Sequence, residues 1–82
     1  MTAIDGNAIA GTLRTVFGTE MTTATGVCAH CGAAAPLGEL VVYADAPGVV
    51  ARCASCGQVL MVIVQRERIA CVDASGFATI NA

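Results

Sequence analysis

The spacing of apolar residues changes from helical near the N-terminus to extended over the rest of the chain. Between Asp5 and Phe17 one apolar stripe recurs every three to four residues, which predicts a helix. Its members are Ile9, Leu13, Val16 and Phe17. Asp5 or Asn7 can cap the start of this helix, and Gly18 can take the left-handed position after its end.

The remaining residues predict β-structure. Strands are expected where β-branched and apolar residues gather between turn signals, at 20–27, 37–44, 49–53, 58–65 and 69–74. Asp45–Gly48, with its proline and glycine, predicts a turn, and the charged tripeptide at 66–68 predicts another. The pattern assigns no element to residues 75–82.

The stretch 59–64 is apolar at every position instead of alternating. A strand with one wet face alternates, so a continuous run indicates cover on both faces. The N-terminal helix can cover one face, and another subunit or a partner protein can cover the other. This run is therefore the main sequence evidence for an interaction surface.

Two CxxC pairs carry the candidate chemistry: Cys28, Cys31, Cys53 and Cys56. Two intervening residues let a tight turn point both sulfurs at one ion, and a glycine follows each pair. The segment 32–52 between the pairs can form a hairpin that brings them together. The pattern predicts a zinc ribbon with one structural Zn²⁺, whose four thiolates leave no open position for a substrate.

Other interpretations of the cysteines remain open. Iron in a rubredoxin-like site uses the same ligands, although the scarcity of aromatic residues disfavours it. Two separate disulfide-like pairs, or a redox-active CxxC, would need an oxidising context or a βαβ frame, and the sequence indicates neither. Cys71 is expected to be a buried free thiol that packs as a small hydrophobe, with a reactive thiol as the alternative. His30 is expected to be an exposed residue of the first pair, with a partner contact as the alternative.

Composition and charge bound the function. A length of 82 residues predicts a single domain, with the helix in 1–19 and the ribbon in 20–82. A domain this small often needs a bound metal or a partner to be stable. Only 12% of residues are charged, the net charge is −2, and the four basic residues are arginines. A nucleic-acid-binding ribbon using Arg52, Arg66 and Arg68 is therefore the weaker alternative. No acid–base pair or phosphate loop indicates an enzyme.

The N-terminal segment lacks a basic region followed by a continuous apolar core, so no export signal is expected. A reducing cytoplasm is then the expected compartment. There, paired cysteines bind metal more often than they form disulfides.

Two segments carry a resemblance to a known family: "IDGNAIAGTLRTVFG" and "TTATGVCAHCGAAAPLGELVVYADAPGVVARCASCGQVLM". The chain resembles a family of small actinobacterial proteins with a domain of unknown function and a zinc-ribbon core, over about Asp5 to Ser75. The resemblance implies that the four paired cysteines are the metal ligands, and it implies no established activity. The knuckles alone are also similar to ribbons of transcription and ribosomal proteins, whose basic and aromatic side chains are missing here.

The expected fold is a small metal-bound α+β protein: a zinc ribbon with an antiparallel sheet of three to five strands and an N-terminal helix packed on it. The expected function is that of a non-catalytic module. It would bind another protein, or a second copy of itself, through the apolar sheet face.

Overall fold

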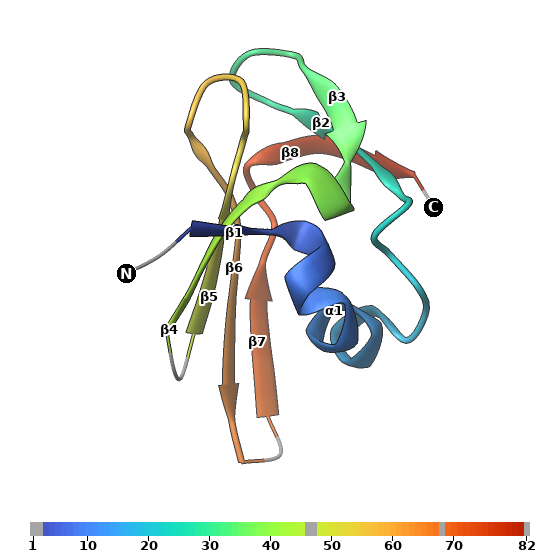
Figure 1. The fold of residues 1–82 in the computed structure, drawn as a ribbon, viewed down its shortest axis with the longest axis vertical. Coiled ribbons are helices and arrows are strands. Elements are labelled where there is room, and N and C mark those ends of the chain that lie inside the picture. The colour runs from blue at the N-terminus through green and yellow to red at the C-terminus, as the bar shows by residue number, and fades with distance from the viewer. Residues whose placement is uncertain (1–2, 46–47, 68, 82) are drawn as a thin grey trace.

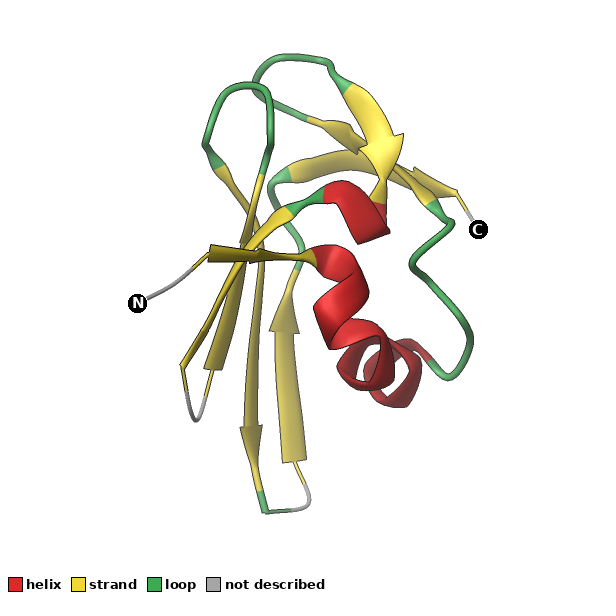
Figure 2. Cartoon of the chain, viewed as in Figure 1, coloured by secondary structure: helices red, strands yellow, loops and turns green. Residues whose placement is uncertain are grey.

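The structure, a computed structural model, describes residues 3–45, 48–67 and 69–81, and these form two antiparallel sheets, an N-terminal helical segment and a second, three-residue 3₁₀ helix (Figures 1 and 2). The larger sheet has five strands in the order β1 (Ala3–Asp5), β4 (Val41–Asp45), β5 (Gly48–Arg52), β6 (Val59–Arg66) and β7 (Ile69–Asp73). The smaller has three, in the order β3 (Ala34–Pro36), β2 (Thr25–Cys28) and β8 (Phe77–Asn81).

The N-terminal helix is confirmed, but its first turn is a 3₁₀ helix, η1 (Gly6–Ile9), that continues into α1 (Ala10–Phe17). The Asp5 carboxylate caps η1 by accepting a hydrogen bond from the Ala8 amide at 3.1 Å. Gly18 ends α1 at φ 78°, and its amide donates to the Arg14 carbonyl at 2.8 Å. Both predicted end signals therefore act as expected. No helix among the described residues is long and apolar enough to cross a bilayer.

The core lies between the helical segment and one face of the five-stranded sheet, which we call the inner face (Figure 1). Leu13 of α1 is almost fully buried there, and so are Val42, Met61 and Ile63 of the sheet. Aliphatic side chains make up most of this core because the chain has three aromatic residues. The helix thus covers one face of the sheet, as the sequence indicated.

The opposite, outer face of the five-stranded sheet is apolar but only half-buried. Strand register places Tyr43, Val50 and Val62 in one row across three neighbouring strands. Val64 follows on the same face of β6. All four side chains are of intermediate burial. The expectation of cover on both faces of 59–64 therefore holds for the inner face, while the outer face remains partly accessible among the described residues.

Two of the predicted strands begin later than the pattern indicated. The strand predicted for 20–27 is wrong over its first half, because the Thr22 amide and hydroxyl both donate to the Glu20 carboxylate and form a local turn. The strand predicted for 37–44 begins at Val41, because its start is a 3₁₀ helix, η2 (Leu37–Glu39). The Leu37 amide donates to the Ala24 carbonyl at 2.9 Å, which ties η2 to the segment before β2.

The strands β1, β3 and β8, and with them the three-stranded sheet, were not predicted. The first two have three residues each, too few for a periodic pattern. β8 lies in the segment to which no element was assigned. The central residues of the predicted turn at 45–48 lie outside the described residues, as does Arg68 of the predicted turn at 66–68. Asp45 and Gly48 pair as the ends of a hairpin, as do Arg66 and Ile69.

Candidate metal centre

The four paired cysteines converge on one point where the two sheets meet. Cys28 is the last residue of β2, and Cys53 directly follows β5. The ligand atoms of the two pairs all lie within 4.8 Å of one another. The Sγ atoms of Cys28 and Cys56 are 3.7 Å apart, and so are those of Cys31 and Cys53.

The two CxxCG turns, which we call knuckles, have the same backbone geometry. The Gly32 amide donates to the Cys28 carbonyl at 2.9 Å, and the Gly57 amide donates to the Cys53 carbonyl at the same distance. Both glycines have left-handed backbones, with φ of 77° and 79°. Residues other than glycine rarely adopt this backbone conformation, which explains the glycine after each cysteine pair. The knuckles are the two adjacent loops that join β2 to β3 and β5 to β6 (Figure 1).

The first cysteine of each knuckle is buried and is surrounded by backbone amides. The amides of His30 and Cys31 point at the Cys28 sulfur, at 3.3 and 3.4 Å. The hydrogen bond from the Cys31 amide, helped by that from His30, lowers the pKa of Cys28. In the second knuckle the amide of Cys56, with that of Ser55, lowers the pKa of Cys53 to about 6. Both sulfurs therefore lose their proton more readily than an ordinary thiol, which helps them bind a metal as thiolates.

The second cysteine of each knuckle, Cys31 or Cys56, is exposed, and its pKa is raised instead of lowered. The Ala33 amide acts to lower the pKa of Cys31, but desolvation and the neighbouring thiols outweigh it and raise this pKa to about 12. The Gln58 amide is likewise outweighed at Cys56 by desolvation and by the thiols of Cys28 and Cys53, so the pKa of Cys56 is raised. A divalent cation would neutralise the crowded negative charge and displace both protons.

The cluster fits a tetrahedral metal ion held by four sulfurs. In a tetrahedral site with metal–sulfur bonds of about 2.3 Å, the sulfurs lie about 3.8 Å apart. In the cluster, the sulfurs of Cys28 and Cys56 and those of Cys31 and Cys53 are 3.7 Å apart. The two amides directed at Cys28 are the outer-shell donors that a metal-bound thiolate uses. The ion would be held by the four paired cysteines, Cys28, Cys31, Cys53 and Cys56. It would then cross-link the two sheets.

Acidification is expected to release the metal. Because the pKa of Cys53 is lowered to about 6, its thiolate persists well below the usual range, and this contribution is lost as the pH falls through that value. Cys31 and Cys56 must each lose a proton to bind the ion throughout this range, so the affinity for Zn²⁺ should fall at least about ten-thousandfold between pH 7 and pH 5. Competition with a chromophoric chelator at a series of pH values measures this change. An affinity that stays constant down to pH 5 would contradict a four-thiolate site.

The two remaining candidate residues lie outside this cluster. Cys71 is exposed on β7, so the expectation that it would be buried is wrong. The apolar surroundings that suggested burial, Ile69 to Val72, belong to an edge strand. His30 is exposed within the first knuckle, as expected, and contributes its amide to Cys28.

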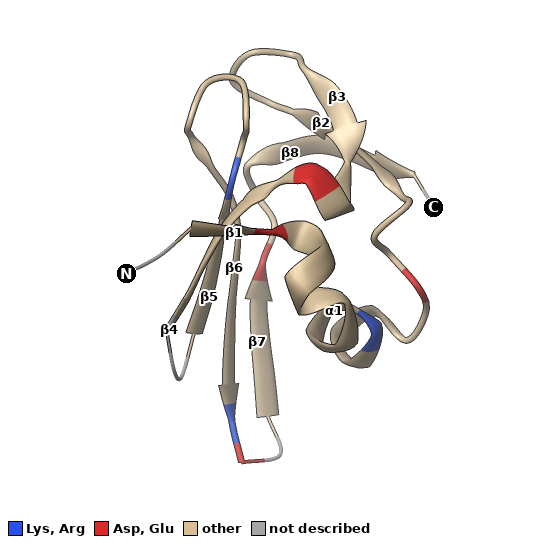
Figure 3. Ribbon diagram, in the orientation of Figure 1, with Lys and Arg blue, Asp and Glu red and all other residues tan. Residues whose placement is uncertain are grey.

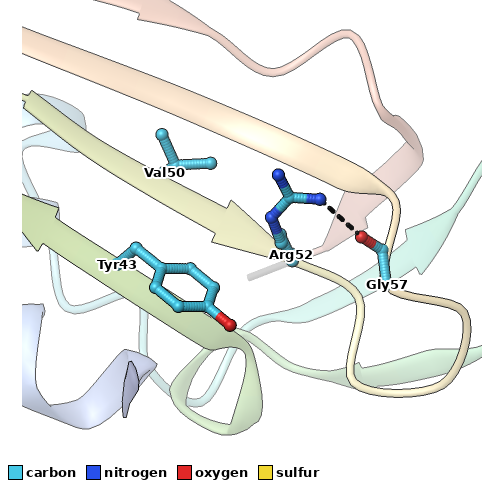
Figure 4. Close-up of a pocket in the computed structure, with 4 residues that line it drawn as sticks. All are labelled: Tyr43, Val50, Arg52 and Gly57. Carbon is cyan, nitrogen blue, oxygen red and sulfur yellow. Dashed lines mark hydrogen bonds between the residues drawn. The ribbon is translucent and has the colours of Figure 1, made fainter. Parts of the chain in front are cut away.

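A pocket of about 650 Å³ on the outer face was not anticipated from the sequence. Figure 4 shows its lining, in which Tyr43, Val50 and Arg52 project from β4 and β5 beside the second knuckle. Arg52 Nη1 donates to the Gly57 carbonyl at 2.9 Å. The predicted turn at 45–48 already implied that Tyr43 pairs with Val50, so the hairpin register was the signal that could have revealed this pocket.

The described basic residues do not form a common surface. Arg52 pairs with Val59 at the first residue of β6, whereas Arg66 is its last residue. Figure 3 shows the basic positions separated along the sheet and on α1. Arg68 lies outside the described residues. Phosphate backbones bind to clustered positive charge, so this distribution does not favour a nucleic-acid-binding face.

The fold and the cluster define a class: small α+β proteins in which four cysteines, close enough to hold one metal ion, join two antiparallel sheets. Within that class, the chain belongs to DUF6510, a family of unknown function, whose model matches residues 1–82. No curated protein and no solved structure matches the chain significantly.

Proposed function

We propose that the protein is a non-catalytic zinc-ribbon module of the cytoplasm, in which one Zn²⁺ is purely structural. Four sulfur ligands fill a tetrahedral shell, so the ion would have no position for water or substrate. Zinc is favoured over iron because the chain has few aromatic side chains to shield a redox centre. The knuckles then serve to hold the two sheets, and with them the outer face, in one geometry.

We further propose that the outer face of the five-stranded sheet binds another protein. The observation that carries this proposal is the row of half-buried apolar side chains on that face, opposite a packed inner face. Contiguous exposed apolar surface of this kind marks interaction sites. The matching partner surface is an apolar segment that enters the pocket lined by Tyr43 and Val50 and carries a carboxylate beside Arg52. The Arg52 guanidinium has donors beyond its bond to Gly57.

A charge placed in the middle of the outer face tests this function. Val62→Lys puts a cation in the central row, where a bound partner would have to desolvate it, so capture of a partner should fall at least about tenfold. The measurement is quantitative mass spectrometry of proteins captured from a lysate of the source organism by wild-type and variant protein. Unchanged zinc content and circular dichroism would show that the variant is folded.

Thr79→Lys is the matched control, because it adds the same charge at an exposed position of β8 in the other sheet. It should capture the same proteins as the wild type. If Val62→Lys also captures them undiminished, the outer face is not the binding surface.

A further inference from the structure

Strand β7 is an exposed edge of the five-stranded sheet. All five of its residues are exposed, and Ile69 and Val72 keep 69% and 40% of their surface accessible to solvent. An edge strand presents unpaired backbone N–H and C=O groups, which can pair with another strand.

The register of the hairpin formed by β6 and β7 shows which backbone groups of β7 are not paired with β6. Arg66 pairs with Ile69 across a loop of two residues, and the pair that closes such a loop exchanges backbone hydrogen bonds. Hydrogen-bonded pairs recur at every second position, so Cys71 and Asp73 also direct their backbone groups to β6. Ala70 and Val72 therefore direct theirs outward.

The neighbouring hairpin gives the same alternation independently. Asp45 and Gly48 close this hairpin, again across a loop of two residues. Gly48, Val50 and Arg52 of β5 therefore form their backbone hydrogen bonds with β4. Val49 and Ala51 then bond to β6, at Ile63 and Met61. This leaves Val62 and Val64 to bond to β7, which agrees with the assignment made from the first hairpin.

The other sheet edges of the described structure are protected. β1 and β3 have three residues each, and β3 ends in a proline. β8 has a register shift in its ladder with β2. Short strands, prolines and bulges are the usual means of blocking edge pairing. Among the described edges, β7 alone combines five residues with an uninterrupted ladder.

We propose that β7 pairs with β7 of a second copy of the chain, antiparallel across a two-fold axis that passes beside Cys71. Ala70 then lies opposite the partner's Val72, and Val72 opposite the partner's Ala70. Each of these two pairs exchanges two backbone hydrogen bonds, so all the outward groups of both residues are satisfied. The two five-stranded sheets become one sheet of ten strands.

The side chains suit this register. On the outer face Cys71 lies opposite the partner's Cys71 at a non-hydrogen-bonded position, where Cα atoms are about 4.5 Å apart. Val64 flanks Cys71 in the same row. On the inner face the partner's Val72 comes beside Ala70, which lines a second pocket of about 250 Å³ with Thr15 of α1. Asp73 lies opposite the partner's Ile69, so no charged residue of β7 faces its own copy.

Shifting the register by two residues loses these features. A two-fold axis at Ala70 would set the partner's Val72 opposite position 68, which precedes the first residue of β7, Ile69. An axis at Val72 sets Cys71 opposite the partner's Asp73 and moves Ala70 beyond the partner's strand. The axis at Cys71 is the arrangement in which the whole strand is paired.

Sedimentation equilibrium of the zinc-loaded protein tests the dimer. We expect the wild type to shift from chain mass to twice that mass between about 1 µM and 1 mM, the range of a small interface. Cys71→Lys places two cations opposite each other and should stay at chain mass throughout. Thr79→Lys and Val62→Lys should dimerise like the wild type. A monomeric wild type, or a dimeric Cys71→Lys protein, overturns the proposal.

A second measurement tests the register. Dibromobimane alkylates two neighbouring thiolates with loss of two bromides and becomes fluorescent when both have reacted. It should link two copies of the wild type through Cys71 and should not link Ala70→Cys/Cys71→Ser. The reverse result would place the axis at Ala70 and overturn the proposed pairing. Val62→Lys tests partner capture by the outer face, and Cys71→Lys tests pairing of the β7 edge. The proposed function and this inference can therefore be contradicted independently of each other.

Discussion

Removal of the proposed zinc ion with a chelator is expected to unfold the protein, and so is replacement of a single candidate ligand, Cys31→Ser. Cys31 is exposed, so the serine variant loses little packing and its effect reports on the metal. Structural zinc contributes about 10–16 kcal/mol of apparent free energy in small zinc-binding peptides, which is comparable to the whole stability of a typical domain, about 5–15 kcal/mol. Each knuckle belongs to a different sheet, so loss of the ion also removes the link between the sheets.

Far-ultraviolet circular dichroism and thermal melting measure this loss, and elemental analysis of the native protein should give one zinc ion per chain and no iron. Cys71→Ser is the matched control, because Cys71 is also an exposed cysteine and lies outside the cluster. It should keep its zinc, spectrum and melting temperature. If the chelated protein or Cys31→Ser keeps an unchanged spectrum and melting temperature, the cysteine cluster is not a structural metal site.

The parts of the fold that could be predicted are those in which the signal is local. The stripe of Ile9 and Leu13, with Asp5 before it and Gly18 after it, specifies the helix within one short window. The turn at 45–48 specifies the hairpin of β4 and β5. That hairpin was enough to predict that the two CxxC pairs meet, because each pair is a local turn and the hairpin brings its ends together.

The three-stranded sheet could not be predicted because its pairing is long-range and its strands carry weak patterns. β2 pairs with β8, about fifty residues later. The large apolar residues of β8, Phe77 and Ile80, are three positions apart and so do not show the alternation of a strand. The exposure of Cys71 was missed for a related reason. Apolar residues next to one another indicate burial only when the strand is internal, and the sequence does not reveal that β7 is an edge.

The contact between η1 and η2 is a second feature that no local pattern reveals, and it gives the other large effect we expect. Gly6 is buried in η1, and a Cβ atom at this position would clash with the Leu37 carbonyl oxygen of η2. That atom belongs to the backbone and cannot rotate away. Gly6→Ala must therefore separate the two 3₁₀ helices at the point where the N-terminal segment packs on the fully buried Leu37.

We expect Gly6→Ala to destabilise the zinc-loaded protein by about 3 kcal/mol or more, the upper range for overpacking, and so to lower the melting temperature by about 12–24 °C. Gly11→Ala is the control, because a Cβ there meets nothing within 4 Å. Alanine at this helical position should stabilise the protein by about 0.5–1 kcal/mol. Thermal melting in a buffer of fixed free zinc compares the two, since metal binding is then the same for both variants. Equal stabilities for Gly6→Ala and the wild type would mean that η1 and η2 do not pack backbone against backbone, and the helical segment would then lie differently on the inner face of the sheet.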